Sequence, residues 1–574
     1  MTKTKNILRM MLGNHTIKMS LIKKTFLMLL FVVIANKFSV AQTGIIDNTV
    51  TVVAAYEPTL SDAYKITFNP TMKDTVFEAP KLKYTIESKD INTTITLEPI
   101  KAAKVVGEPV NKLYKNLIKA GFGNYTTPYV ELYANSTRSR TTSLGLHVKY
   151  LGSSGSIGDY DNSNYSDLNL DLYGKKYLKS ATMDAEVFFS RNAMKYYGYD
   201  HSMNTVMNSI DNTQHYAYVG FNASYYSNYV DSNSLNHRFT LGYSHLADNY
   251  SYGENNVKLK IDVDQSFKLF KATDRQTIGL KADVDFYNNS GATISTANNA
   301  LIKLLPYIST HYNEYMFLAA LNVSFTTGSV SKIYIYPVIE GSLAVVPKVL
   351  KAFAGIKGEV TRNSFKSITD VNPFVESSVP MGYSSNKFEF YGGINSSLTK
   401  TIDFTARLSN KYIDGMPLFV NDTNVASMNR FTIVYDNVNV FNINSELQWR
   451  YDDKFTILIK GNWNQYSAKN ETEAWHKPSL DATLSFYYNI NNKIITHADI
   501  FAFDKMYART FVANKVVSQE ISGMIDFNLG IEYRLTKIFS AFLNLNNLTA
   551  MRYSYWYNYP NQRFNMMAGL TYAF

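Results

Sequence analysis

Apolar and polar residues alternate over long stretches from about residue 113 to the C-terminus. In residues 144–150, 278–286, 441–451 and 525–535, apolar side chains occupy nearly every second position, and most positions between them are polar. Side chains point to opposite faces of a strand at successive residues. Each segment therefore predicts a β-strand with one apolar face and one polar face.

The length of these segments distinguishes between a soluble sandwich and a membrane barrel. They run for roughly 10–14 residues, whereas globular strands usually have about 5–6 and a tilted membrane strand needs about 9–11. Aromatic residues also gather beside short turns, with Trp449 and Tyr451 before Asp452 and Tyr533 before Thr536. This is where an interfacial aromatic girdle is expected. The pattern predicts an all-β, transmembrane antiparallel β-barrel over residues 113–574, with roughly 22 strands (a range of about 16–22).

The connections between these segments alternate in length. Near the C-terminus, short turns are predicted at 399–400, 452–453, 491–492 and 536–537. Long polar connections are predicted near 364–385, 414–437, 467–479 and 507–522. Periplasmic turns of bacterial outer-membrane barrels are short and their external loops are long. Both ends of the barrel are therefore expected on the periplasmic side, in the cell outer membrane.

Residues 1–41 have the layout of a signal peptide. Lys23 and Lys24 precede an apolar run from Phe26 to Ala35, and small residues follow up to Ala41. The run is too short to span a bilayer as a helix, although the same residues would also suit a buried N-terminal helix. Residues 42–112 contain five of the 14 prolines and predict a short, irregular, extended periplasmic segment.

Composition removes several classes of function. Of the net charge of +10, residues 1–41 contribute seven positive charges and no acidic residue, which leaves +3 for the rest and no basis for nucleic-acid binding. The chain has no Cys, so disulfides, thiolate metal sites and a Cys nucleophile are excluded. The 44 Tyr residues suit surfaces that are apolar at one end and wet at the other.

Two segments resemble a known family. The end of the chain, with Asn544 to Leu548 and Gly569 to Phe574, resembles the C-terminus of TonB-dependent outer-membrane receptors. Asp47 to Ala54 looks like a TonB box, and Ala120 to Pro128 is similar to the barrel opening of a Bacteroidota branch of these receptors. The resemblance implies uptake of a solute across the outer membrane, with TonB as a partner.

The resemblance also implies roles for particular residues. The segment expected to add as a strand to TonB consists of Thr49, Val50, Thr51, Val52 and Val53. The same β-branched run would also suit a strand that pairs inside the periplasmic segment. At the other end, Leu570, Tyr572 and Phe574 share the apolar face of the last strand and are expected to be read by the barrel-assembly machinery.

One feature departs from the family. These receptors close their barrel with a large folded plug, whereas only residues 42–112 separate the leader from the first strand here, and a complete plug is not expected. Either this segment and inward loops close the lumen, or a separate plug protein does. A second hypothesis follows: a plugless structural subunit of a larger outer-membrane assembly, in secretion, barrel insertion or surface-lipoprotein display, with a surface lipoprotein as partner.

No enzyme motif emerges from the sequence, and no cofactor or metal is expected. There is no His-Glu-x-x-His, phosphate loop or Gly-x-Ser-x-Gly turn. His147 is expected to line the lumen rather than bind a metal, and Asp526 and Glu532 to be solvated pore-lining carboxylates. His201 and His215 flank a loop, and the side chains of Tyr196, Tyr197, Tyr199 and His201 are suited to binding sugar or peptide.

Overall fold

The computed structural model describes most of the predicted barrel. It covers residues 113–574 apart from 137–138, 158–162, 200–211, 229–232, 270–274, 292–296, 329–330, 424, 426 and 513–514, together with Lys83, Thr85 and Glu87. The predicted signal peptide, the TonB-box-like segment Thr49 to Val53, His201 and nearly all of residues 42–112 lie outside the described residues.

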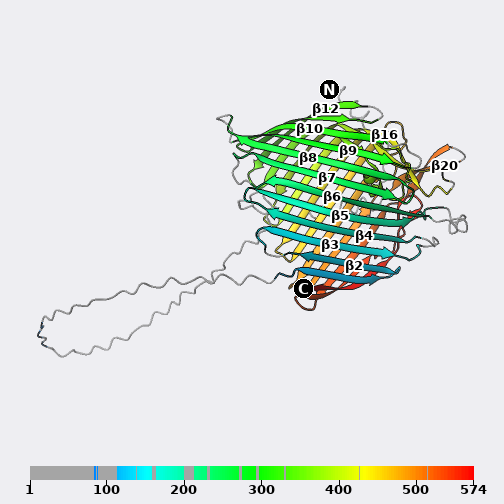
Figure 1. Cartoon of the computed structure of the whole chain (residues 1–574). Helices are drawn as coiled ribbons and strands as arrows, with labels where there is room; N and C mark the ends of the chain where they lie inside the picture. The colour runs from blue at the N-terminus through cyan, green and yellow to red at the C-terminus, as the bar shows by residue number, and fades with distance from the viewer. Residues whose placement is uncertain are drawn as a thin grey trace, which may run out of the picture. The chain divides into compact units, whose positions relative to one another are not determined.

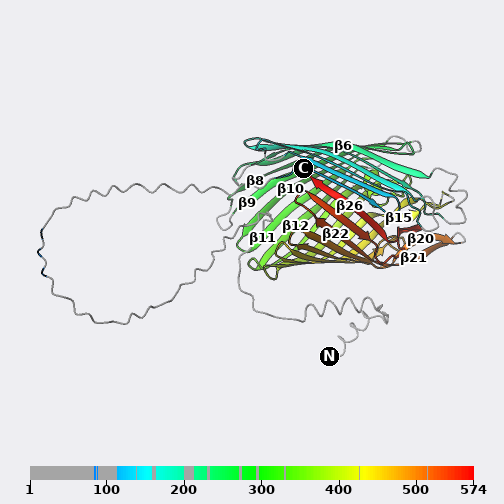
Figure 2. The same ribbon diagram turned by 90° about the horizontal axis from the view of Figure 1, so that it is seen from below.

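The described chain folds into one closed antiparallel barrel of 22 strands (Figures 1 and 2). Each strand pairs with the next along the chain, and β26 pairs with β1 to close the sheet. Closure leaves no strand edge unpaired, which a membrane barrel requires. The barrel strands are β1 (Asn116–Gly123), β2 (Thr127–Asn135), β3 (Thr142–Ser153), β4 (Tyr165–Tyr177), β5 (Ala181–Lys195), β6 (Thr213–Ser227), β7 (Asn236–Asp248), β8 (Gly253–Phe267), β9 (Gln276–Ser290), β10 (Ala297–Tyr312), β11 (Tyr315–Thr326), β12 (Lys332–Val346), β13 (Leu350–Asn363), β14 (Gly382–Ser397), β15 (Ile402–Asn421), β16 (Phe431–Tyr451), β17 (Phe455–Ala468), β18 (Leu480–Ile490), β19 (Ile494–Phe503), β22 (Met524–Arg534), β23 (Phe539–Asn546) and β26 (Asn565–Ala573). The prediction of the fold class and of the strand number is confirmed.

Three further elements lie in connections between these strands. Helix α4 (Phe365–Val371) follows β13. The hairpin β20 (Met506–Val512) and β21 (Lys515–Ile521) projects from the end of the barrel between β19 and β22 (Figure 2). The short pair β24 (Ser554–Trp556) and β25 (Tyr559–Pro560) lies between β23 and β26. Among the described residues, no helix is long and apolar enough to cross a membrane.

The two faces of the wall are as the alternation predicts. Along β22, Ile525 and Tyr533 are exposed on the outside, whereas Asp526 between them is buried. Neighbouring strands continue the outer apolar face through Leu484 and Ile500. At the short-turn end, aromatic rings form an edge-to-face cluster, with Phe455 5.3 Å from Trp449 and 5.1 Å from Phe486. This matches an apolar band bordered by an aromatic girdle.

The seam that closes the barrel depends on two glycines. Gly121 of β1 lies opposite Gly569 of β26. A Cβ at Gly569 would lie 2.3 Å from the Ala120 carbonyl oxygen and 2.3 Å from the Phe542 ring. A Cβ at Gly121 would lie 2.9 Å from the same ring. The ring therefore lies over both backbones, which only glycine permits.

Some connections differ from the prediction. The predicted short turns are confirmed, and Asp452, Asn491 and Asn492 have positive φ, as tight hairpins need. The predicted loop 414–437 is wrong at both ends, because β15 continues to Asn421 and β16 begins at Phe431. The predicted loop near 507–522 is mostly the β20–β21 hairpin.

Candidate functional site: a packed lid and its cavity

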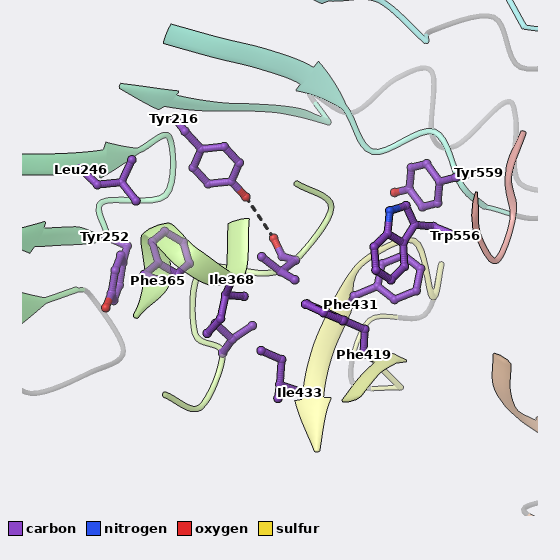
Figure 3. Packing of buried hydrophobic residues seen from close by; sticks show 12 residues of the cluster. Tyr216, Leu246, Tyr252, Phe365, Ile368, Phe419, Phe431, Ile433, Trp556 and Tyr559 are labelled. Atoms are coloured by element: carbon purple, nitrogen blue, oxygen red, sulfur yellow. Dashed lines mark hydrogen bonds between the residues drawn. The ribbon is translucent and has the colours of Figure 1, made fainter. Parts of the chain in front are cut away.

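One end of the barrel carries a packed cluster of apolar side chains, to which long connections between the strands contribute. We define the lid as the described parts of connections 364–381, 422–430, 469–479 and 547–564. Its side chains pack with those of neighbouring strand ends. The cluster has twelve buried members (Figure 3): Tyr216, Leu246, Tyr252, Phe365, Ile368, Val375, Val379, Phe419, Phe431, Ile433, Trp556 and Tyr559.

The cluster spans the lumen. Tyr216 and Leu246 come from β6 and β7, whereas Phe419 and Phe431 come from β15 and β16. These strand pairs lie on well-separated sides of a 22-strand ring. Side chains from both sides join one cluster through α4, which carries Phe365 and Ile368 between them (Figure 3). The lid therefore reaches across the barrel instead of lining its rim.

Helix α4 is fixed to the wall at its first turn. The Ser364 hydroxyl caps the helix by accepting from the Ser367 amide at 3.2 Å. The Glu254 carboxylate of β8 accepts from the amides of Phe365 at 2.8 Å and Lys366 at 3.1 Å. Free amides at a helix start attract an acidic group. This bonding holds the Phe365 ring 4.2 Å from Tyr252 and 5.9 Å from Tyr216.

Tyrosine hydroxyls satisfy the loop carbonyls inside the lid. Tyr196 donates to the Val375 carbonyl at 2.8 Å, and Tyr216 donates to the Pro373 carbonyl at 3.0 Å. Tyr197 donates to the Pro560 carbonyl at 3.0 Å, and Tyr559 donates to the Asn429 carbonyl. Buried loop backbone needs such partners. These bonds connect segments that are far apart in sequence into one closed layer.

Arg430 adds a charged clamp. Its guanidinium lies 4.7 Å from the ring centroids of both Tyr196 and Tyr250. It also donates to the Tyr250 hydroxyl at 3.1 Å. A guanidinium between two aromatic faces gains cation–π attraction, which is larger when water is excluded. The clamp joins the 422–430 connection to the β7–β8 turn.

His476 is the buried titratable side chain at the centre of the 469–479 connection. It is 1% exposed and its ring lies 5.1 Å from Trp556 and 5.4 Å from Phe431. Burial lowers the pKa of His476 to about 4. The ring is therefore neutral at pH 7, and its Nδ1 lies 3.1 Å from the Phe419 carbonyl oxygen, which assigns the proton to Nδ1.

Trp475 and Glu471 connect the lid to the projecting hairpin. The Trp475 indole donates to the Glu471 carboxylate at 2.8 Å. Arg509 of β20 pairs with the other oxygen of that carboxylate at 3.1 Å. Trp475 itself packs with Leu418 and Val420 of β15. The far end of β15 is thus covered on both faces.

A cavity of about 690 Å³ lies between the lid and one side of the wall. Its lining contains mainly amide and tyrosine side chains, with five charged residues. The polar lining includes Tyr165, Asn192, Tyr218, Asn528, Asn546, Tyr553, Asn561, Gln562 and Asn565. The charged lining residues are Asp167, Lys366, Asp370, Asp526 and Arg563. Such a mixture of aromatic faces and polar groups is typical of a small-molecule site.

The structure places the residues predicted as the assembly signal on the outer face of the wall. Leu570, Tyr572 and Phe574 are exposed on the outer face, at 51%, 43% and 51%. The Phe574 carbonyl accepts from the amides of Lys115 at 3.1 Å and Asn116 at 2.9 Å, which fixes the C-terminus to the start of β1. The predicted TonB contact Thr49 to Val53 lies outside the described residues.

The structure contradicts the predicted roles of two tyrosines and of Asp526. Tyr196 and Tyr199 are 0% and 2% exposed, so they belong to the buried core and are not available to a ligand. Tyr197, by contrast, lines the cavity. Asp526 is not a solvated pore residue, since it is 5% exposed. The signal for this buried layer was apolar residues such as Phe374, Val375 and Val379 in a connection expected to be polar.

His147 lines the wall, as predicted. Its two ring nitrogens lie 3.1 Å from Glu131 and 3.2 Å from Asp171. The ring stacks on Tyr133 with centroids 4.4 Å apart. Within the described part of the chain, no group of three or more His, Cys, Asp or Glu residues is placed to hold a metal ion.

Comparison with known proteins supports the fold only. No family model and no curated protein matches the sequence. Solved barrels do match in structure: the FrpB iron transporter from Neisseria meningitidis has a TM-score of 0.63 at 7% identity, covering 81% of this chain and 83% of its own. The pyoverdine outer membrane receptor FpvA from Pseudomonas aeruginosa has a TM-score of 0.62 at 9% identity, covering 81% and 79%.

A third structure gives the same result. The ferric-catecholate import receptor Fiu from K12 E. coli has a TM-score of 0.59 at 10% identity, covering 81% of this chain and 82% of its own. The fold is thus that of TonB-dependent outer-membrane receptors, which confirms the predicted resemblance at the level of the fold. The Bacteroidota branch and the missing plug stay predictions.

Proposed function

We propose that this protein takes up a solute across the outer membrane, and that the lid closes the lumen on the external side. The observation that carries the proposal is a lid with its own apolar core across a barrel of the receptor fold. The long-loop end then faces the medium, and the short turns, the C-terminus and residues 42–112 face the periplasm. A barrel closed in this way needs a trigger to open it.

TonB supplies the energy in this proposal, through Thr49 to Val53. The last-strand residues Leu570, Tyr572 and Phe574 serve as the assembly signal, and their outward position at the barrel seam suits contact with another membrane barrel. The FpvA, Fiu and FrpB barrels support a non-enzymatic role, since their names describe receptors and transporters.

One observation favours the second candidate, a structural subunit of a larger outer-membrane assembly. Trp475, Phe365 and Phe431 are 0% exposed, so the lid is packed as tightly as a soluble core. A permanently closed barrel would suit a subunit that passes no solute. The two candidates therefore differ in whether the lid opens during work.

Phe431→Ala tests whether a pathway lies behind the lid. The substitution deletes a ring that contacts Trp556, His476 and Tyr559, and a buried Phe→Ala change removes about 3–5 kcal/mol. In planar bilayers with KCl as the probe, we expect wild-type protein to stay nearly closed and Phe431→Ala to conduct. Phe441→Ala is the matched control, because Phe441 is on the same strand and 37% exposed on the outside. A folded Phe431→Ala barrel that does not conduct would contradict a transport pathway.

Val50→Pro separates uptake from an assembly role. Proline removes a ladder donor and disrupts strand addition to TonB. We expect loss of growth under the nutrient limitation that slows the deletion strain, with an unchanged level of folded, heat-modifiable barrel. Thr49→Val, which keeps a β-branched residue, is the control. Normal growth of Val50→Pro would favour the assembly subunit.

A further inference from the structure

The cavity beside the lid contains one carboxylate whose bonding is incomplete. Asp526 of β22 lines the cavity and is 5% exposed. One oxygen accepts from the Tyr553 hydroxyl at 2.9 Å. The other oxygen has no hydrogen-bond partner among the described residues. A buried carboxylate oxygen without a donor is unfavourable, so this position favours an added donor.

Among the described residues that line the cavity, no charged side chain forms an ion pair with Asp526. Lys366 bonds to both oxygens of Asp370 at 2.5 and 2.6 Å, and these two charges balance. Asp167 accepts from the Asn192 amide at 2.7 Å. The Nε of Arg563 donates to the Ala550 carbonyl at 3.0 Å. With Lys366 and Asp370 set aside, two carboxylates face one guanidinium, so the lining has an excess of negative charge.

The lining of this cavity already contains one ammonium group, that of Lys366. Lys366 Nζ lies 4.7 Å from the centroid of the Tyr218 ring while it bonds to Asp370. A carboxylate and a tyrosine face together make a favourable site for an alkylammonium. On the β22 side, the Asp526 carboxylate accepts from the Tyr553 hydroxyl, and its other oxygen bonds to no ammonium group of the described residues.

We propose that this cavity binds a solute bearing a protonated primary amine, with Asp526 as its counter-ion. The inference rests on the proposed function, because it names the class of solute that the barrel takes up. Asp526 accepts the ammonium, and Tyr553 orients the carboxylate through its hydroxyl. The amides of Asn528, Asn546 and Gln562 provide hydrogen bonds to the rest of the molecule.

Calorimetric titration of the purified full-length protein tests this site. The probe is 1,4-diaminobutane at pH 7.5, and the matched neutral probe is 1,4-butanediol, which has the same carbon chain. We expect the diamine to bind at least about tenfold more tightly than the diol, because a desolvated ion pair exceeds a neutral contact by more than 1.4 kcal/mol. Equal affinities, or no heat with the diamine at millimolar concentration, would overturn the proposal.

Three variants assign the effect to the carboxylate. Asp526→Asn keeps the shape and should weaken diamine binding at least about tenfold, with little change for the diol. Asp526→Glu restores the charge and should recover part of that loss. Glu532→Gln, on the same strand but outside the cavity, should bind like wild type. Folding is checked by heat-modifiable migration, and an Asp526→Asn protein that binds the diamine normally excludes the assignment.

Failure here is distinct from failure of the proposed function. The Phe431→Ala conductance measurement uses KCl and needs no amine. Conduction without diamine binding would leave the transport barrel intact and reject only the amine-bearing solute. Diamine binding without conduction would retain the site and reject the pathway.

Discussion

The barrel wall and the lid use apolar side chains in opposite ways. In the wall, Leu484 and Ile500 point outward and are 37% and 38% exposed, because lipid surrounds them in the membrane. In the lid, Phe365 and Phe431 are 0% exposed and are surrounded by protein. The wall therefore has its polar face inside, whereas the lid has a core like that of a soluble domain.

Different interactions therefore stabilise the wall and the lid. The wall is held by a continuous ring of backbone hydrogen bonds, whose alternatives in lipid are unfavourable. The lid is held by packing, by tyrosine–carbonyl bonds and by the Arg430 clamp. Among the described residues, the backbone contacts between lid and wall are few and scattered, such as the Val375–Phe431 bridge and the bonds from Lys469 to Asn437 and from Leu548 to Phe527. In the function proposed above, the lid opens while the barrel stays folded.

We expect the largest effect from a charged side chain placed on the outer face of the wall. Leu484 lies near the middle of β18, between Ile459 and Ile500 on the neighbouring strands. Leu484→Arg places a guanidinium in lipid, which destabilises a barrel by about 2–4 kcal/mol near the midplane. We expect less folded, heat-modifiable protein in the outer membrane.

The control for this charge is the adjacent residue. Thr483 faces the lumen, so Thr483→Arg adds the same charge to a watery environment and should leave the folded level unchanged. Equal loss from both variants would mean that the assignment of faces on β18 is incorrect.

The wall was predictable from the sequence because its rule is local. A period of two residues, strand lengths that fit a membrane, and aromatic residues beside turns indicated strands such as β16, β22 and β26 with the correct face outward. The rule failed where both faces are covered by protein. Leu418, Phe419 and Val420 are consecutive buried residues at the end of β15, so alternation is lost there and the sequence pattern predicts a loop.

The lid was not predictable, because its contacts are distant in sequence. Tyr196 reaches Val375 and Tyr197 reaches Pro560, which lie 179 and 363 residues away. No short pattern encodes such pairs. The cavity was missed for the same reason, since Asp526 and Lys366 come from separate parts of the chain. The sequence does single out the Tyr-rich stretch, but Tyr196 and Tyr199 are core residues.

The lid also differs from the wall in how protons affect it. His476 is neutral in the closed lid because burial lowers its pKa to about 4. When the lid opens, the ring meets water and its pKa returns toward about 6.5. Above that pH neither state holds the proton, and the closed lid has its full stability. Between about pH 6.5 and 4 only the open state is protonated, so acid favours opening.

The smaller and final effect we expect is therefore acid opening of the lid. Each unit by which the pH falls in this window lowers the free energy of lid opening by about 1.4 kcal/mol, or by about 2 kcal/mol from pH 6.5 to 5. Glu376 opposes this change, because burial and its contact with Asp422 raise its pKa, so that protonation stabilises the closed lid.

Hydrogen exchange of residues 469–479 between pH 7.5 and 5, corrected for the intrinsic rate, should show weaker protection in acid. His476→Gln stays neutral and should lose this dependence, whereas His147→Gln in the wall should retain it. If His476→Gln shows the wild-type pH profile, another group controls the lid.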